Sequence, residues 1–262
     1  MSIIDIHAHI FPDALALKAV AALESVGTLR AHYDGTIAGL KAEMRRTGVD
    51  ISVVQPVATK VSQVRSINEW VATLADDHIV PFGAMHPDLV DPAEEMERIS
   101  AAGIRGFKLH PEHQAFEPHD PRLAPLYEAA IAHDMVVFFH AGADEVHDTC
   151  HGTPESFAAL LDAFPDLTVV LAHMGGYRCW NGVSDLLVGR DVWFDTAFTP
   201  GHLSDDRLLA MIRAHGVDRV LFGSDGPWTD AKGEMAHLRA LGLEAAEIEA
   251  ILGGNAARLL GR

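Results

Sequence analysis

Histidine and aspartate residues recur at the ends of apolar segments along this chain, a placement that suits metal chemistry. His7 and His9 end the first such segment, His140 and His173 end the fifth and sixth, and Asp225 ends the eighth. Histidine is the commonest metal ligand, and a carboxylate oxygen completes many such sites. With 16 histidines in the chain, one His-x-His pair is weak support, so the recurrence at segment ends carries the argument. We predict a metal site formed by these five residues.

The apolar segments predict the scaffold that would position these ligands. Runs rich in Val, Ile and Phe alternate with amphipathic segments, and they are nearly continuous in hydrophobicity, as parallel strands covered on both faces require. Eight such units favour a closed (β/α)8 barrel, a TIM barrel, over an open doubly wound sheet, and 262 residues suit one barrel domain over 1–262. The predicted strands are Ile3–His9, Ile51–Val57, Ile79–His86, Arg105–His110, Met135–His140, Leu167–His173, Val192–Ala197 and Arg219–Asp225.

Two regions are less regular. Pro12–Thr47 is longer than one helix, and we expect Gly27–Gly35 to form a loop over the barrel mouth. The tail, Leu243–Leu260, is predicted to be a helix, a Gly-Gly-Asn break with Asn255 as N-cap, and a short final helix. Clear helical segments between strands are Asp91–Ala102, Arg122–His133, Thr153–Phe164 and Ser204–His215.

Side chains near the strand ends are expected to converge on one mouth. Residues two apart in a strand share a face, so His7 and His9 point the same way, as do Lys108 and His110. Chemistry in such barrels lies at the C-terminal ends of the strands. By the same alternation, Asp5 is expected to face the interior and orient a ligating histidine.

Aromatic and cationic side chains near the same ends predict the substrate class. We expect His110, Tyr177, Arg178 and Trp228 to bind substrate, with Trp180 and Phe198 nearby. Aromatic walls with one or two cations suit a small carboxylate-bearing molecule, cyclic ones included. Asp195, which ends the seventh strand, is expected to face inward as a polar support.

Other histidines are expected to be structural or solvated. His78, His133 and His215 each precede a strand, where a partly charged ring at a helix end is favourable against the helix dipole. Among the loop histidines, His147 and His151 are the better candidates for substrate contact because they follow the fifth strand.

The motifs resemble the amidohydrolase superfamily, and they are most similar to its amidohydrolase-related (amidohydrolase 2) branch of compact barrels. The resemblance covers nearly the whole chain, and its motifs identify the superfamily better than the substrate. They are Asp5-Ile6-His7-Ala8-His9, Gly106-Phe107-Lys108-Leu109-His110-Pro111, Phe139-His140-Ala141-Gly142, Leu171-Ala172-His173-Met174-Gly175-Gly176, Leu221-Phe222-Gly223-Ser224-Asp225 and Gly254-Asn255-Ala256-Ala257-Arg258-Leu259.

The resemblance implies a role for each ligand. His7 and His9 hold a divalent metal, His140 supplies a further ligand, and Asp225 binds the metal and handles the proton of its water. His173 is either a ligand to a second metal or a free acid/base.

Lys108 separates one-metal from two-metal versions of the site. In two-metal members of the superfamily, a lysine at the end of the fourth strand becomes a carbamate that bridges both ions, and Lys108 stands at that place. The other reading is an unmodified lysine that pairs with Asp225 or a substrate carboxylate, beside one metal. Zinc is the first choice of ion, and Mn, Fe, Co or Ni also suit nitrogen and oxygen ligands.

The resemblance leaves two reactions open. The first is hydrolysis of an amide, lactone or ester through a metal-activated water, with Asp225 and His173 as catalytic groups. The alternative is a metal-dependent decarboxylase of an aromatic or unsaturated acid. A third class, a protein that binds a metal or a small molecule without catalysis, makes no use of a proton-handling pair such as Asp225 and His173.

The net charge and the lengths of the apolar runs exclude several classes of partner. A net charge of −17 argues against nucleic acid and anionic membranes. Apolar runs are too short to cross a bilayer, and the first residues lack the pattern of a signal peptide, so we expect a cytoplasmic protein with a small-molecule substrate. Cys150 and Cys179 are expected to be free thiols. A homodimer is compatible with a compact barrel, although no sequence pattern identifies its interface.

Overall fold

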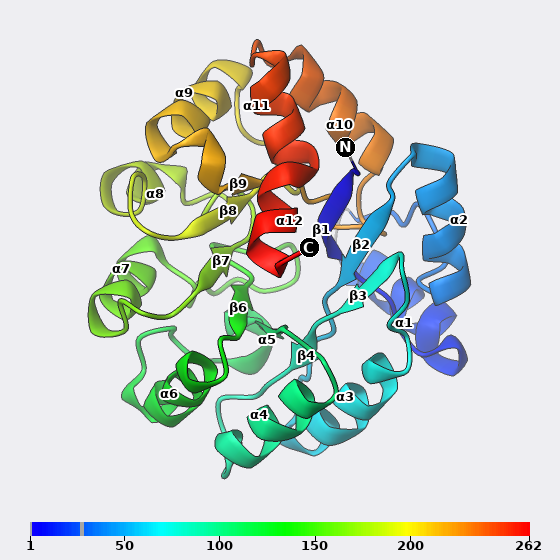
Figure 1. Cartoon of the computed structure of the whole chain (residues 1–262), viewed down its shortest axis with the longest axis vertical. Helices are drawn as coiled ribbons and strands as arrows, with labels where there is room; N and C mark the ends of the chain where they lie inside the picture. Colours follow the sequence, from blue (N-terminus) through cyan, green and yellow to red (C-terminus); the bar gives the residue numbers. More distant parts are fainter. Residues whose placement is uncertain (1, 27–28) are drawn as a thin grey trace.

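The strands of the computed structural model, which describes residues 2–26 and 29–262, form a closed ring with helices outside it (Figure 1). β1, β2 and β3 pair in parallel, as do β4 to β9, and β3 and β4 are two halves of one predicted strand separated at Phe82. Backbone hydrogen bonds from Ile6 N to Phe222 O (2.9 Å) and from Asp225 N to His7 O (2.8 Å) close the ring. The predicted (β/α)8 barrel is confirmed. The strands are β1 (Ile4–Ala8), β2 (Ile51–Val54), β3 (Ile79–Pro81), β4 (Gly83–Ala84), β5 (Gly106–Leu109), β6 (Val136–Phe139), β7 (Val169–Leu171), β8 (Trp193–Asp195) and β9 (Val220–Leu221).

Capping residues define where several helices begin. Thr36, Asp91 and Thr153 each accept a hydrogen bond from the backbone N–H three residues on, which satisfies one of the free donors of α2, α4 and α7. The helices are α1 (Asp13–Val26), α2 (Ile37–Thr47), α3 (Val64–Ala72), α4 (Pro92–Ala101), α5 (Pro111–Gln114), α6 (Ala124–Ala132), α7 (Pro154–Ala163), α8 (Trp180–Leu186), α9 (Asp205–His215), α10 (Ala231–Ala240), α11 (Ala245–Glu249) and α12 (Asn255–Leu260).

Apolar side chains fill the barrel from its N-terminal end. Ile6, Val53, Phe82 and Phe138 pack together inside the ring, and Ala256 of α12 belongs to the same cluster. In Figure 1, α12 lies across the front of the ring, so it covers this end. A larger apolar cluster fills the layer between the strands and the outer helices. The opposite end of the barrel is left to polar side chains, which is where the predicted site residues lie.

A bulge in β1 changes which residues face the interior. Between Asp5 and Ala8 this strand advances three residues while β2 advances two, so one residue is extra. Ile6 and His7 consequently both reach the interior, although they are adjacent in sequence. Asp5 instead lies on the outer side, where Ser224 donates from N (2.9 Å) and Oγ (2.6 Å) to its carboxylate. The prediction that Asp5 faces the interior with His7 was wrong, because alternation does not hold across a bulge.

The C-terminal segment also differs from the prediction. A π-helical turn, Ala250–Gly254, joins α11 directly to α12, so there is no Gly-Gly-Asn break. Asn255 is itself helical and does not act as an N-cap. Its side-chain amide donates to the carbonyl oxygens of Val217 and Val220, each at 2.8 Å, and this demand for a donor beside β9 explains the asparagine.

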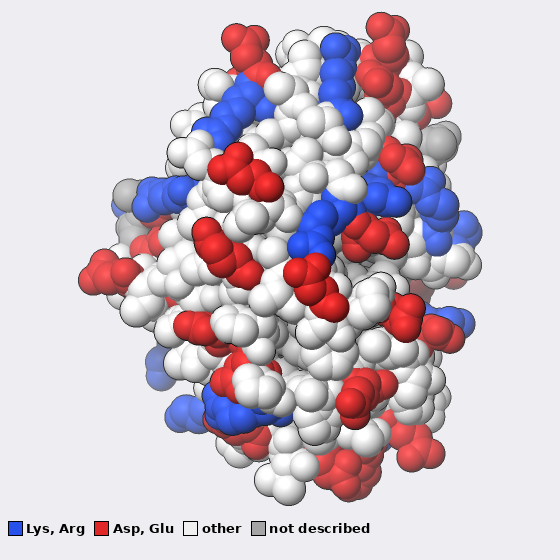
Figure 2. All heavy atoms as spheres, turned by 90° about the vertical axis from the view of Figure 1, so that its left-hand side faces the viewer, with Lys and Arg blue, Asp and Glu red and all other residues white. Residues whose placement is uncertain are grey.

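The segment before α2 covers the barrel mouth, as predicted for Gly27–Gly35, of which Gly27 and Thr28 lie outside the described residues. Leu29 lines the cavity at the mouth, and Tyr33 donates a hydrogen bond to His9 O at 2.7 Å. Acidic side chains are scattered among basic ones on the face shown in Figure 2. Among the described helices, none combines the length and apolarity needed to cross a bilayer.

Candidate metal centre and active site

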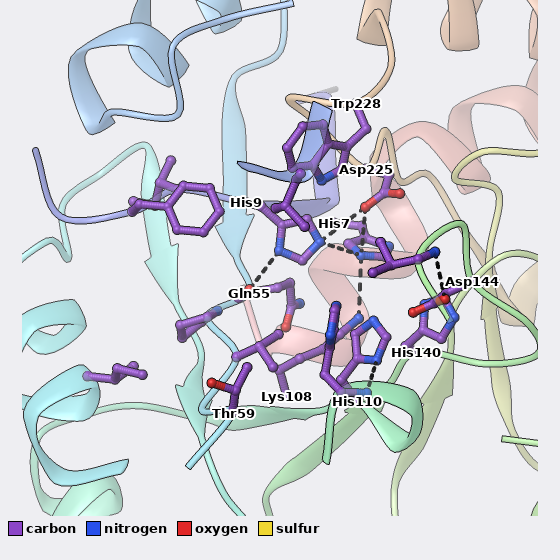
Figure 3. Close-up of a pocket in the computed structure, with 18 of the residues that line it drawn as sticks. His7, His9, Gln55, Thr59, Lys108, His110, His140, Asp144, Asp225 and Trp228 are labelled. Carbon is purple, nitrogen blue, oxygen red and sulfur yellow. Dashed lines mark hydrogen bonds and ion pairs between the residues drawn. The ribbon is translucent and has the colours of Figure 1, made fainter. Parts of the chain in front are cut away.

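Three donor atoms meet at the C-terminal end of the barrel. His7 Nε2 lies 3.1 Å from His9 Nε2 and 3.2 Å from Asp225 Oδ1, and His9 Nε2 lies 3.1 Å from that same oxygen. Figure 3 shows the two rings and the carboxylate pointing at one another. The donors come from the end of β1 and from the turn after β9, which are neighbours in the ring. The predicted grouping of His7, His9 and Asp225 is therefore present in the structure.

Hydrogen bonds on the far side of each ring fix which nitrogen is free. His7 Nδ1 lies 2.8 Å from Asp195 Oδ2, and His9 Nδ1 lies 2.8 Å from Gln55 O. Because both partners are acceptors, each Nδ1 must carry the proton, which leaves a lone pair on Nε2 in the neutral ring. Burial and the nearby Lys108 lower the pKa of His7 well below its usual range, so this ring is neutral.

The geometry of these donors fits a divalent metal ion. Two nitrogen lone pairs and one carboxylate oxygen face a common point, an arrangement that repels itself without a cation. A tetrahedral site with metal–ligand bonds of about 2.0–2.1 Å has ligands about 3.3 Å apart. The observed separations of 3.1–3.2 Å agree with that value. His7, His9 and Asp225 are thus suited to hold an ion.

His140 and His173 form a second pair of facing donors. His140 Nδ1 lies 3.2 Å from His173 Nε2, and their other nitrogens lie 3.0 Å from Ala143 O and Ala197 O. The same reasoning gives each facing nitrogen a lone pair. The ring centroids of His173 and His7 are 5.4 Å apart, so the pair adjoins the first three donors.

Lys108 lies beside both sets of donors. Its Nζ is 3.4 Å from His7 Nε2 and 4.2 Å from the centre of the Phe138 ring, and the side chain is 1% exposed. Burial lowers the pKa of Lys108 to about 7, although Asp195 and Asp225 act in the opposite direction. Neutral and charged amine are then both present at neutral pH, and both readings stay open, because only a neutral amine can form a carbamate and a charged one pairs with a carboxylate.

Asp195 is the buried support for the centre. Its Oδ2 holds His7, while Oδ1 accepts from His173 N (2.7 Å) and Ala197 N (3.0 Å). Burial raises the pKa of Asp195, and nearby His173 and Lys108 oppose that rise. One carboxylate therefore orients ligands from β1 and from the end of β7.

Two site residues have unusual backbone conformations. His173 and Asp225 have φ of 58° and 60°, in the left-handed region that residues other than glycine rarely adopt. Hydrogen bonds hold both turns: Trp180 Nε1 donates to His173 O at 2.9 Å, and Trp228 N donates to Asp225 O at 2.9 Å. Trp180 is therefore a support behind the site, and it is not among the described residues that line the cavity.

A cavity of about 560 Å³ opens onto these donors. His110, Tyr177 and Trp228 line it as expected, together with Phe198 and a largely apolar wall that includes Phe11, Leu15, Leu23, Leu29, Ile67 and Trp70. Arg178 differs from the prediction. Its guanidinium lies 2.7 Å from Glu145 Oε1, the side chain is 55% exposed, and it is not among the described residues that line the cavity.

Three further histidines considered in the sequence lie outside the donor sets, and their surroundings differ. His215 is buried against Phe194, and burial lowers its pKa to about 4, so the expected partly charged ring at the helix end is wrong there. His147 bonds Asp144 through Nδ1 at 2.7 Å. His151 N donates to Glu112 Oε1 at 2.6 Å, and this histidine is not among the described residues that line the cavity.

Several polar cavity residues were not predicted as site residues, and three of them bear on the chemistry. His113 and Asp144 line the wall near His110, and Gln55 lines the floor with its Oε1 lacking a hydrogen-bond partner among the described residues. The spacing His110-x-x-His113, with His110 as the N-cap of α5 and His113 within this helix, could have indicated that the two histidines lie together. Asp144 lies in a loop, and its position depends on tertiary folding that the local sequence does not encode.

Comparison with known proteins identifies the family. The profile of a family described as amidohydrolase matches residues 4–262, so the chain belongs to that family. No curated protein sequence matches the chain.

Similar solved structures agree with the barrel fold. An uncharacterized TIM-barrel protein from Bordetella bronchiseptica is 23% identical with a TM-score of 0.78, and the match covers 100% of each chain. 5-Carboxyvanillate decarboxylase from Sphingomonas paucimobilis is 18% identical with a TM-score of 0.75 over 99% of each chain. A dihydroxybenzoic acid decarboxylase from Polaromonas, with bound manganese and the inhibitor 2-nitroresorcinol, is 16% identical with a TM-score of 0.74, over 99% of this chain and 97% of that one.

Proposed function

We propose that this chain is a metal-dependent decarboxylase of an aromatic or unsaturated carboxylic acid. The observation that carries the proposal is an apolar, partly aromatic cavity of about 560 Å³ that ends on the His7, His9 and Asp225 donors. A volume of this size suits a small ring acid. Two of the similar structures are named as decarboxylases of substituted aromatic acids, which supports this reaction over the hydrolysis that the sequence favoured first.

The donor set supports a proposed assignment of the metal ligands. His7, His9 and Asp225 would hold the ion, and His140 is placed to add a further nitrogen. When bound, a divalent ion there would supply Lewis acidity toward oxygen atoms of the substrate. The manganese bound to the Polaromonas protein supports manganese, beside zinc, among the candidate ions.

Decarboxylation asks the protein for a proton and for apolar surroundings. The bond to the carboxylate carbon breaks, its electron pair stays on the remaining carbon, and a proton fills that position as carbon dioxide leaves. We propose that His173 Nε2 takes a proton from water onto its lone pair and delivers it to this carbon, because its Nδ1 is committed to Ala197 O. An isolated carboxylate is costly in apolar surroundings, so the walls around Phe198 and Trp228 favour its conversion to neutral carbon dioxide.

Lys108 and Gln55 are proposed to orient the acid. In the one-metal version, Lys108 Nζ would bind the substrate carboxylate. In the two-metal version, a carbamate on Lys108 would supply a ligand, with His7, His9 and Asp225 holding one ion and His140 and His173 the other. Gln55 Oε1, which is buried and has no partner among the described residues, is placed to accept a hydrogen bond from a substrate hydroxyl.

Hydrolysis uses the same donors and remains the second candidate. Asp225 Oδ1 lies beside the two histidine nitrogens, where a carboxylate could take the proton of a bound water. The position of this carboxylate is the observation that favours hydrolysis.

Carbon dioxide release separates the two reactions. Protein reconstituted with manganese or zinc would be incubated with hydroxybenzoic and unsaturated acids, and in parallel with lactones, esters and amides. We expect carbon dioxide from at least one acid, and we expect its loss in His9→Gln. Hydrolytic turnover of a lactone, ester or amide without carbon dioxide from any acid would overturn the proposal.

A further inference from the structure

A second group of metal-ligating side chains lies in the cavity wall, apart from the His7, His9 and Asp225 set. His110 follows β5, His113 lies on the short helix α5, and Asp144 lies in the loop after β6. One ring nitrogen of each histidine and one carboxylate oxygen lie within 4.8 Å of one another. We propose that His110, His113 and Asp144 bind a second divalent transition-metal ion, which we call the wall site.

Asp144 is held in place for this role. Its Oδ1 accepts from Val146 N (2.9 Å) and His147 N (2.6 Å), and its Oδ2 lies 2.7 Å from His147 Nδ1. The side chain is only 8% exposed. A carboxylate fixed by an outer histidine and by backbone donors is the arrangement that commonly orients metal ligands.

The two histidines are positioned as a pair on one side of the wall. Their ring centroids are 4.1 Å apart, and His113 N lies 3.4 Å from His110 Nδ1, a long hydrogen bond that a metal at that nitrogen would replace at little cost. Because His110 Nδ1 accepts this hydrogen bond, it carries a lone pair that a metal ion can use. Two imidazole nitrogens and one carboxylate oxygen suit Zn²⁺, Co²⁺ or Ni²⁺.

The wall site is adjacent to the first donors and distinct from them. His110 stacks on His140 at a centroid distance of 4.1 Å and an interplanar angle of 6°, so the His140 ring stands between the wall site and His173. Figure 3 shows Asp144 on the His140 side of the cavity, away from His9.

An ion at the wall site would also contact the cavity. His110, His113 and Asp144 all line it, so with three protein ligands a further coordination position stays available to an oxygen of a bound molecule. The wall site would therefore select ligands with a second oxygen group, such as a hydroxyl or a second carboxylate, remote from the reacting one. This selection rests on the proposed function, whereas ion binding at the wall site does not.

The test is the metal content of each variant. Purified protein would be saturated with Zn²⁺, freed of excess by gel filtration, and analysed by inductively coupled plasma mass spectrometry. We expect two ions in the wild type, one in His113→Gln, one in Asp144→Asn, and one in His9→Gln, which loses the other ion. His151→Gln is the matched control, because it removes a histidine near the same loop that is not among the cavity-lining residues; it should keep both ions.

Two outcomes would overturn the wall site. One is a single ion in the wild type that persists in both His113→Gln and Asp144→Asn. The other is a second ion that both variants keep and Lys108→Met loses, because that ion would belong to a carbamate-bridged centre. If one variant fails to fold, as judged by circular dichroism, the other variant would be titrated with Co²⁺. We expect the wild type to show two phases of visible absorption and this variant to lose one of them. Failure of the proposed reaction leaves these metal counts unchanged, so the two proposals fail separately.

Discussion

Replacing Asp195 by asparagine changes the proton on His7 without changing the shape of the site. Asp195 accepts on both oxygens, from the His7 ring on one side and from the backbone N–H of His173 and Ala197 on the other. An amide has one acceptor end and one donor end. If its oxygen stays on the backbone donors, its NH₂ faces His7 Nδ1, which must then give up its proton. The proton moves to Nε2, and that nitrogen can no longer bind a metal.

The opposite orientation of the amide is also unfavourable. Its NH₂ would then face the N–H groups of His173 and Ala197, leaving two buried donors without an acceptor. Loss of an outer partner of a ligating histidine typically costs 10–100-fold in metal affinity, or about 1.4–2.8 kcal/mol. We expect Asp195→Asn toward the upper end of that range, because the His7 and Asp195 side chains are 1% and 0% exposed and water cannot replace the bond.

Competition between the protein and a chelator of known affinity measures this effect directly. Asp5→Asn is the matched control, because it makes the same change in a buried carboxylate near His7 that faces away from the cavity. We expect Asp5→Asn to keep the wild-type metal affinity. If Asp195→Asn binds the ion as tightly as the wild type, the tautomer argument is refuted.

Three further predictions follow from buried groups. Burial lowers the pKa of His215 to about 4 from its ordinary 6.5, so its contribution to stability is full above pH 6.5 and is lost as the pH falls from 6.5 toward 4, a loss of about 3 kcal/mol. In urea unfolding, His215→Gln should lose less stability over this pH range than the wild type, and an equal loss in both proteins would contradict the prediction. Gly142 has φ of 82°, and an added Cβ would lie 2.3 Å from the backbone of Tyr177, so Gly142→Ala should lower the free energy of unfolding by about 2 kcal/mol or more. Gly201 has φ of 78° and open space around an added Cβ, so Gly201→Ala measures the cost of the positive φ alone, and equal effects of the two substitutions would show that the contact with Tyr177 costs nothing. Lys108→Met should weaken the binding of hydroxybenzoates about tenfold or more, because a hydrogen bond to a charged group contributes about 1.5–3 kcal/mol; calorimetry that finds an unchanged Kd would place the amine outside the carboxylate subsite.

The barrel was predictable because its signals are local and repeated. Apolar runs that alternate with capped amphipathic helices leave few other architectures, and Thr153 before α7 is a cap that the sequence displays. The ligand positions follow from the same logic, since parallel strands bring their C-terminal ends together. His7, His9 and Asp225 could therefore be grouped although they are far apart in sequence.

The misses have physical causes that lie outside local pattern. The bulge in β1 turns Asp5 outward because one extra residue breaks the alternation, and the sequence carries no mark of it. Asn255 is a helical donor to two carbonyls because α12 packs against the end of β9, a contact made by the folded chain. Asp144 enters the cavity wall through a loop, and Arg178 is drawn to Glu145 instead of the cavity.

Anomalous diffraction from crystals grown with manganese or zinc tests the central claim most directly. We predict a peak about 2.0–2.2 Å from His7 Nε2, His9 Nε2 and a carboxylate oxygen of Asp225, at the point where their lone pairs converge. An anomalous map with no peak between these three residues, in crystals saturated with the ion, would contradict the metal centre and the reaction proposed from it.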